Sequence, residues 1–145
     1  TGLDTNPLDR LVLLNICLCS MNNVEELNMA NLSGRQQNAF NAGRIFNLIC
    51  YAQREAIGET GKTILVSNAS LAATRPASII PALVTRLHSV YLPKLRRDKP
   101  RLATNVDKQL SDLLRGTELP LVLNTEQMGW FRKGFYHRDS RGETQ

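Results

Sequence analysis

The chain has 145 residues, of which 42% are hydrophobic and 21% are charged, the size and composition of one ordinary globular domain. A domain of this length buries enough surface to fold without a metal or a disulfide, and the lack of repeats and low-complexity tracts excludes a solenoid. The net charge of +5 comes from residues 73–145, which carry thirteen basic and seven acidic side chains, and this asymmetry favours a polyanionic partner.

Two helices are predicted in the first half of the chain. Pro7 suits the first turn of a helix, and the leucine-rich residues up to Leu18 make that helix apolar almost all round. Residues 34–57 form the longest periodic run, with apolar side chains three, four or seven positions apart and Ser33 as a candidate cap. This helix would be about 36 Å long, so we expect it to be the central helix against which the others pack.

Three more helices are predicted in the second half. The first covers residues 79–91, and Pro93 is expected to prevent it from continuing. The second begins at Thr104 or Asn105 and ends at Gly116, and the last follows a cap at Thr125.

The predicted fold class is therefore mainly α: a compact single helical domain of about five helices over residues 1–136. The short apolar segments 63–67 and 119–123 could form one two-stranded pairing, or both could be extended connectors. The polar residues 137–145 are expected to be a frayed tail.

A run of cations follows the helix predicted at 79–91. Within eight residues it holds Lys94, Arg96, Arg97, Lys99 and Arg101, with one acid among them. Pro93 and Pro100 favour a loop here, and cations in a loop can follow a phosphate backbone. Such runs are also common as solvated linkers.

Residues 130–138, WFRKGFYHR, mix four aromatic side chains with cations. Aromatic rings can stack on exposed bases while cations hold phosphates, which is typical of single-stranded nucleic-acid binding. The candidate binding residues here are Arg132, Lys133, Tyr136, His137 and Arg138. Alternatively, Trp130, Phe131 and Phe135 close the core; a mixed outcome, with Trp130 buried and Tyr136 exposed, suits both interpretations.

A polar stripe on the central helix is the candidate surface for a protein partner. It consists of Gln37, Asn41, Arg44, Asn47, Tyr51 and Arg54. These side chains recur at helical spacing, so they could receive a partner helix or form an ordinary solvated face.

No residue pattern indicates catalysis or a cofactor. The stretch 58–63, GETGKT, resembles a phosphate-binding loop, but Ala56 occupies the position of the first glycine and the expected order is helix, loop, extended segment. The odd number of cysteines (Cys17, Cys19 and Cys50) argues against a disulfide framework and for reduced thiols in an intracellular protein. His88 and His137 lie far from them, so we expect no metal site.

The apolar run 11–21 is too short to span a bilayer, so we expect no membrane attachment. The leading hypothesis is a non-enzymatic nucleic-acid-binding module, for DNA or RNA, that uses a basic and aromatic surface in the C-terminal half. The alternative is a protein-interaction domain, for assembly or as an adaptor, that binds an acidic protein surface or a second copy of itself. An enzyme with a dispersed site is the third reading, and the chain could be a piece of a longer protein.

Overall fold

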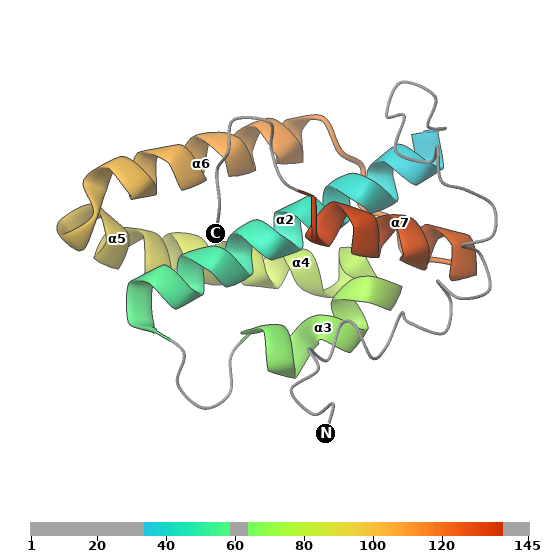
Figure 1. Cartoon of the computed structure of the whole chain (residues 1–145), viewed down its shortest axis with the longest axis horizontal. Coiled ribbons are helices and arrows are strands. Elements are labelled where there is room, and N and C mark those ends of the chain that lie inside the picture. Colours follow the sequence, from blue (N-terminus) through green and yellow to red (C-terminus); the bar gives the residue numbers. More distant parts are fainter. Residues whose placement is uncertain (1–33, 59–63, 138–145) are drawn as a thin grey trace.

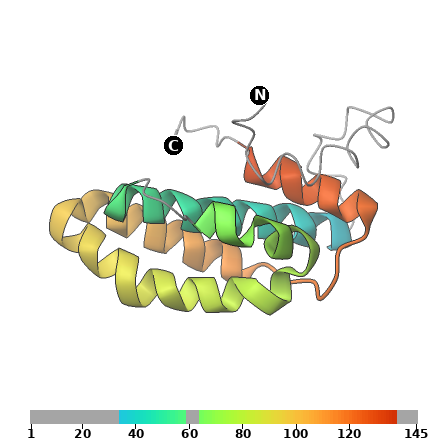
Figure 2. The ribbon, with the colours of Figure 1, turned by 90° about the horizontal axis from the view of Figure 1, so that it is seen from below.

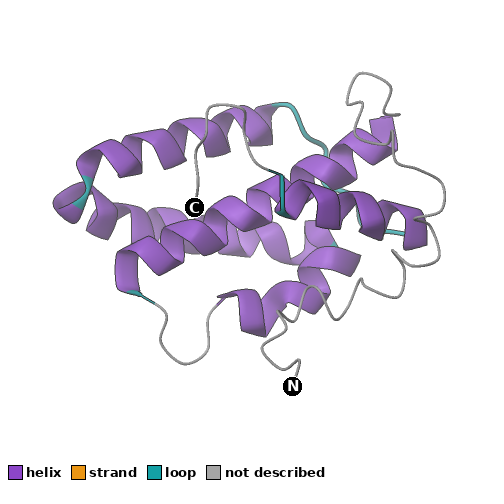
Figure 3. Cartoon of the chain, in the orientation of Figure 1, coloured by secondary structure: helices purple, strands orange, loops and turns teal. Residues whose placement is uncertain are grey.

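A computed structural model of the chain describes residues 34–58 and 64–137. This part of the chain is mainly helical and has no strand, which confirms the predicted fold class (Figures 1 and 3). The elements are α2 (Gly34–Ile57), α3 (Ile64–Thr74), α4 (Pro76–Arg86), the π-helical η4 (Leu87–Tyr91), α5 (Leu92–Asp98), α6 (Pro100–Arg115) and α7 (Thr125–Phe135). The helix expected near residues 7–18, the Ser33 cap and the tail from 138 lie outside the described residues.

The helix α2 is the centre of the fold, as its periodicity predicted. It contacts every other described helix, and Figure 2 shows α7 on one side of it and α4 on the opposite side. Phe40, Ile45, Phe46 and Ile49 are fully buried. Removing such side chains from water is the main favourable term in folding, so α2 organises the core.

The crossing of α2 and α7 is unusually close because each helix presents a glycine. A Cβ atom at Gly43 would lie 2.0 Å from the carbonyl oxygen of Phe131, and one at Gly134 would lie 1.9 Å from the carbonyl oxygen of Phe40. Gly43 lowers the helix propensity of α2, and the close backbone contact explains why glycine is nevertheless required there.

The predicted two-stranded pairing is wrong. Residues 64–74 are the helix α3, and the alanines of this segment, which favour a helix, outweigh its β-branched start. Residues 117–124 are a connector, and its backbone forms hydrogen bonds with the ends of helices and not with a strand. The Leu123 amide donates to the Thr74 carbonyl (2.8 Å), and the Ala77 amide donates to the Pro120 carbonyl (3.0 Å).

The expected basic loop is also wrong, because both of its prolines lie in first turns of helices. The helix does not end at Pro93: α4 continues through η4 into α5, where Pro93 occupies the first turn. The π-helical turn closes with the Leu92 amide on the Leu87 carbonyl, and a proline just after it leaves no donor unpaired. Pro100 likewise begins α6, four or five residues earlier than predicted.

Candidate nucleic-acid interface

The cations of the 94–101 run lie on a corner where two helices meet. We call Lys94, Arg96, Arg97, Lys99 and Arg101 the corner surface. Lys99, with φ −143° and ψ 70°, ends α5 and precedes α6, so the chain reverses direction at this residue at one end of the molecule (Figure 1). The corner surface is therefore held by helical backbone on both sides.

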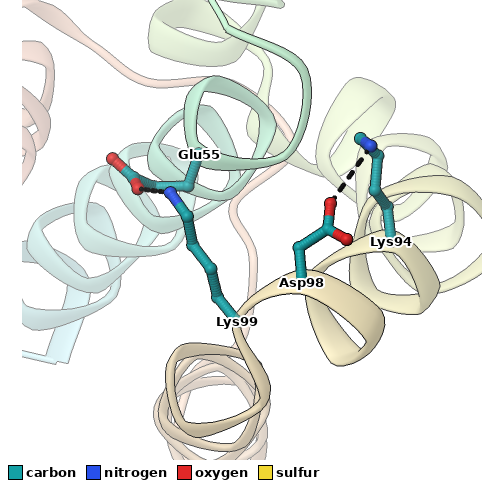
Figure 4. Close-up of polar contacts among 4 residues, drawn as sticks. All are labelled: Glu55, Lys94, Asp98 and Lys99. Atoms are coloured by element: carbon teal, nitrogen blue, oxygen red, sulfur yellow. Dashed lines mark hydrogen bonds and ion pairs between the residues drawn. The ribbon is translucent and has the colours of Figure 1, made fainter.

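Three of the five cations at the corner form ion pairs. Lys94 pairs with Asp98 (3.2 Å), Arg96 with Asp107 (3.5 Å) and Lys99 with Glu55 (2.7 Å). Figure 4 shows the first and last of these pairs, with Lys94 and Asp98 on α5 and Lys99, at the junction with α6, contacting Glu55 of α2. Arg97 and Arg101 are exposed, and neither has an ion pair within the described part of the chain.

Lys99 links the corner surface to the central helix through an ion pair with Glu55. Its Nζ donates to Glu55 Oε1, and this hydrogen bond raises the pKa of Lys99 above its ordinary value of 10.5. The ammonium group is therefore fully charged at neutral pH and is already engaged by a carboxylate. We conclude that Lys99 orients the corner more than it offers a free charge.

The second group of predicted residues lies at the C-terminal end of α7. We call Arg132, Lys133, Tyr136 and His137 the α7 surface; Arg138 lies outside the described residues. The Arg132 guanidinium lies 5.2 Å from the centre of the Tyr136 ring, and the rings of His137 and Phe40 are 5.2 Å apart. Tyr136 is 41% exposed, and its ring also makes an edge-to-face contact with Phe135 at a centroid distance of 4.8 Å, so the ring is only partly accessible to solvent.

The larger aromatic side chains of α7 close the core. Phe131 is fully buried, Phe135 is 6% exposed and Trp130 is 8% exposed. Phe46 packs against both phenylalanine rings of α7, at centroid distances of 6.1 and 5.8 Å. Stacking of a base on Trp130, which the sequence had left open, is therefore excluded in this conformation.

Two polar interactions fix where α7 begins. Asn124, rather than the predicted Thr125, is the N-cap: its Oδ1 accepts from the Gln127 amide (2.8 Å), and Gln127 Oε1 accepts from the Asn124 amide (2.9 Å). Glu126 then accepts a hydrogen bond from Gln36 of α2 (2.7 Å). These contacts, with the glycine crossing, place the α7 surface relative to α2.

The corner surface and the α7 surface lie at different positions along α2. His137 contacts Phe40, whereas Lys99 contacts Glu55. These two residues of α2 are fifteen positions apart, which is about 22 Å along the helix axis. The two surfaces therefore do not form one cluster.

The polar stripe on α2 is only partly accessible. Asn41 is 9% exposed and accepts a hydrogen bond from Gln37 (3.1 Å), while Arg44, Asn47, Tyr51 and Arg54 are half-buried. The Arg54 guanidinium lies 5.7 Å from the centre of the Tyr51 ring.

A row of cations on α6 was not among the predicted sites. Lys108 and Arg115 follow Arg101 at intervals of seven residues, and all three side chains are exposed. This spacing was visible in the sequence, but with α6 predicted to start at residue 104 or 105, Arg101 was assigned to a loop. Sequence reasoning therefore separated three residues that share one helix.

The described residues offer no group of three His, Cys, Asp or Glu side chains that could hold a metal ion. Burial raises the pKa of the Cys50 thiol to about 12, so this cysteine is not a nucleophile at neutral pH. The GETGKT stretch lies almost entirely outside the described residues. The extended segment expected after it is wrong, because the helix α3 follows. A helix rather than a strand still precedes the stretch, and Ala56 still occupies the position of the first glycine, so both departures from a phosphate-binding loop remain.

Across residues 34–58 and 64–137, none of the helices has the length and apolar character needed to cross a membrane.

Comparison with known proteins places the chain in a family. No curated protein matches the chain. A family model described as "CRISPR-associated protein (Cas_Csd1)" matches residues 5–141, nearly the whole sequence. The chain therefore belongs to the Cas_Csd1 family of CRISPR-associated proteins.

Proposed function

We propose that this chain is a non-enzymatic nucleic-acid-binding module of a CRISPR system, and that it holds phosphates with its corner surface and its α7 surface. The observation that carries the proposal is the pair of exposed arginines at the corner, Arg97 and Arg101, which have no ion pair among the described residues. An arginine fork can make two hydrogen bonds to one phosphate, and it does so at least cost when it has no carboxylate to leave.

The rigidity of the corner supports the same function. Arg97 lies near the end of α5 and Arg101 in the first turn of α6, so both start from ordered backbone. The Lys99–Glu55 pair ties the junction of these helices to α2. The ordered backbone leaves only the rotamers of the two exposed arginine side chains to be fixed when a phosphate binds.

The α7 surface adds a different kind of contact. The ring of Tyr136 is partly exposed, with Arg132 over it at 5.2 Å and Phe135 packed against it. A ring of this kind can stack on an unpaired base while the neighbouring cation contacts the phosphate. The 22 Å between the two surfaces along α2 means that one ligand spanning both has to be several nucleotides long.

The variant Arg96→Ala/Arg97→Ala/Arg101→Ala tests the proposal by fluorescence anisotropy with labelled single- and double-stranded DNA and RNA at several salt concentrations. We expect weaker binding of every sequence and, on duplex DNA, a plot of log K against log salt that is flatter by about 0.9 per lost contact. Most of the loss should come from Arg97 and Arg101, because Arg96 already pairs with Asp107.

A matched control removes the same charge from elsewhere on the surface. It replaces three exposed arginines outside both surfaces, Arg35, Arg75 and Arg86, with alanine. Equal affinities for the corner variant and this control would refute the role of the corner, because only the total charge would then matter.

A protein-interaction role in assembly is the second candidate, and a specific observation favours it. Leu121 and Val122 are 75% and 61% exposed and adjacent in the connector between α6 and α7. Neighbouring apolar side chains with this exposure are typical of protein contacts. Replacing both with serine should lower self-association in sedimentation velocity, or partner capture that survives nuclease treatment, while leaving nucleic-acid affinity unchanged.

A further inference from the structure

The outward face of α6 carries a straight row of basic side chains. Arg101, Lys108 and Arg115 lie seven residues apart, close to two helical turns, so successive members deviate by only about 20° around the axis. From Arg101 to Arg115 the row extends over fourteen helical steps, about 21 Å. All three side chains are exposed, and α6 forms one long edge of the molecule in Figure 1.

The side chains beside this row carry hydroxyl and amide groups, which are of the kinds that bind phosphate and sugar. Thr104, Asn105 and Ser111 are exposed on the same face of α6. A shallow hollow of about 350 Å³, lined by Pro100, Arg101, Thr104 and Asn105, lies at the beginning of the row. Guanidinium, hydroxyl and amide groups together are typical of contacts to a nucleic-acid backbone.

The composition of α6 also indicates the form of the nucleic acid. Residues 100–115 contain no aromatic side chain, so this face has nothing on which an unpaired base could stack. We infer that the outward face of α6 binds the sugar–phosphate backbone of double-stranded nucleic acid, whose bases are already stacked and paired within the duplex. This inference rests on the proposed function, and it gives α6 and the α7 surface different ligands.

One acidic residue interrupts the row. Asp112 is exposed on the same face and pairs with Arg115, whereas Lys108 and Arg101 have no ion pair within the described part of the chain. Asp107, the other acid near the row, is half-buried and engaged by Arg96. Asp112 should therefore weaken backbone binding, and removing its charge should strengthen it.

The test uses Lys108→Ala/Arg115→Ala, which changes neither the corner surface nor the α7 surface, with Arg75→Ala/Arg86→Ala as the control of equal charge. Binding of a labelled 20-base-pair duplex and of one of its strands is measured by anisotropy at several salt concentrations. We expect on the order of tenfold weaker duplex binding near 0.1 M salt from the loss of Lys108, and a smaller further loss from Arg115, which already pairs with Asp112. The duplex slope should be flatter by about 0.9 to 1.8. Single-strand affinity should change no more than in the control, and Asp112→Asn should tighten duplex binding.

Duplex affinity equal to that of the control, or an equal loss on duplex and single strand, would overturn the inference. If the wild-type chain binds single strands but no duplex, the inference fails while the proposed function stands. If it binds neither form even at low salt, both fail. Circular dichroism of each variant checks that these exposed substitutions leave the fold intact.

Discussion

Replacing Gly134 with alanine should displace α7 from the central helix. The new Cβ atom would lie 1.9 Å from the carbonyl oxygen and 2.8 Å from the carbonyl carbon of Phe40. Both are backbone atoms inside α2, so neither can rotate away, and α7 has to move by about 1.5 Å to restore ordinary van der Waals contact. Overpacking of this kind costs about 1–3 kcal/mol.

Moving α7 also partly exposes Phe131 and Phe135, and burial of one such side chain contributes roughly 1.5–3 kcal/mol. Alanine returns about 1 kcal/mol through its better helix propensity. We therefore expect Gly134→Ala to lower the free energy of unfolding by roughly 3 kcal/mol, measured by urea denaturation followed by circular dichroism.

The matched control is Gly116→Ala. Its Cβ atom would lie 3.7 Å from the Asp112 carbonyl oxygen, which is ordinary contact, so its stability should equal or slightly exceed that of the wild type. Gly43→Ala meets the same crossing from the other helix, and combining it with Gly134→Ala should cost less than the sum, because one displacement relieves both clashes. A Gly134→Ala variant within about 0.5 kcal/mol of the wild type would refute the close crossing.

Three further predictions follow from the contacts of single residues. Asn124→Ala removes the cap of α7 and should lower stability by about 1 kcal/mol in thermal melts, with little effect from alanine at the neighbouring Thr125. With the other two cysteines replaced by serine, Cys50 should react with a thiol reagent at neutral pH only after unfolding, because burial raises its pKa to about 12; rapid labelling of the native protein would contradict this. The pKa of Lys99 is raised by Glu55, so the stabilising effect of this lysine is complete at neutral pH and is lost as the pH rises past its ordinary value of 10.5. The stability difference between the wild type and Lys99→Met should therefore shrink as the pH rises above 10.5, and a difference independent of pH would contradict the pair.

The features predicted correctly are those that a local pattern determines. The bounds of α2 followed from its apolar periodicity, and the burial of Phe131 and Phe135 followed from the need of a small core for large side chains. The exposure of Tyr136 at 41% fits the mixed outcome expected for the α7 segment. None of these features depends on which distant residue is the partner.

The features predicted wrongly depend on structural context that residue composition does not reveal. Pro93 was expected to end a helix, and it would do so in a regular α-helix, but the π-helical turn before it changes the hydrogen-bond register. The segment 119–123 has the composition of a strand, yet its backbone groups bind the ends of α3 and α4. Propensity could not identify these partners, since they lie more than forty residues away in the chain.

The same dependence decides which cations can bind a ligand. A count along the sequence finds five cations in residues 94–101, but folding brings Glu55, Asp98 and Asp107 to three of them, and Glu55 is 44 residues from its partner Lys99. A surface ion pair leaves less charge for an incoming phosphate than an unpaired arginine does, so the local density of cations overestimates this site.

The shifted start of α6 has the opposite effect. With α6 beginning at Pro100, Arg101 joins Lys108 and Arg115 on one helical face. A helix starting at residue 104 or 105 leaves Arg101 in a loop and only two cations on the helix. A difference of four or five residues at one helix end thus converts a compact basic loop into a row about 21 Å long. Since a row of this length can follow a backbone over several phosphates, the position of Pro100 determines how large the proposed nucleic-acid surface would be.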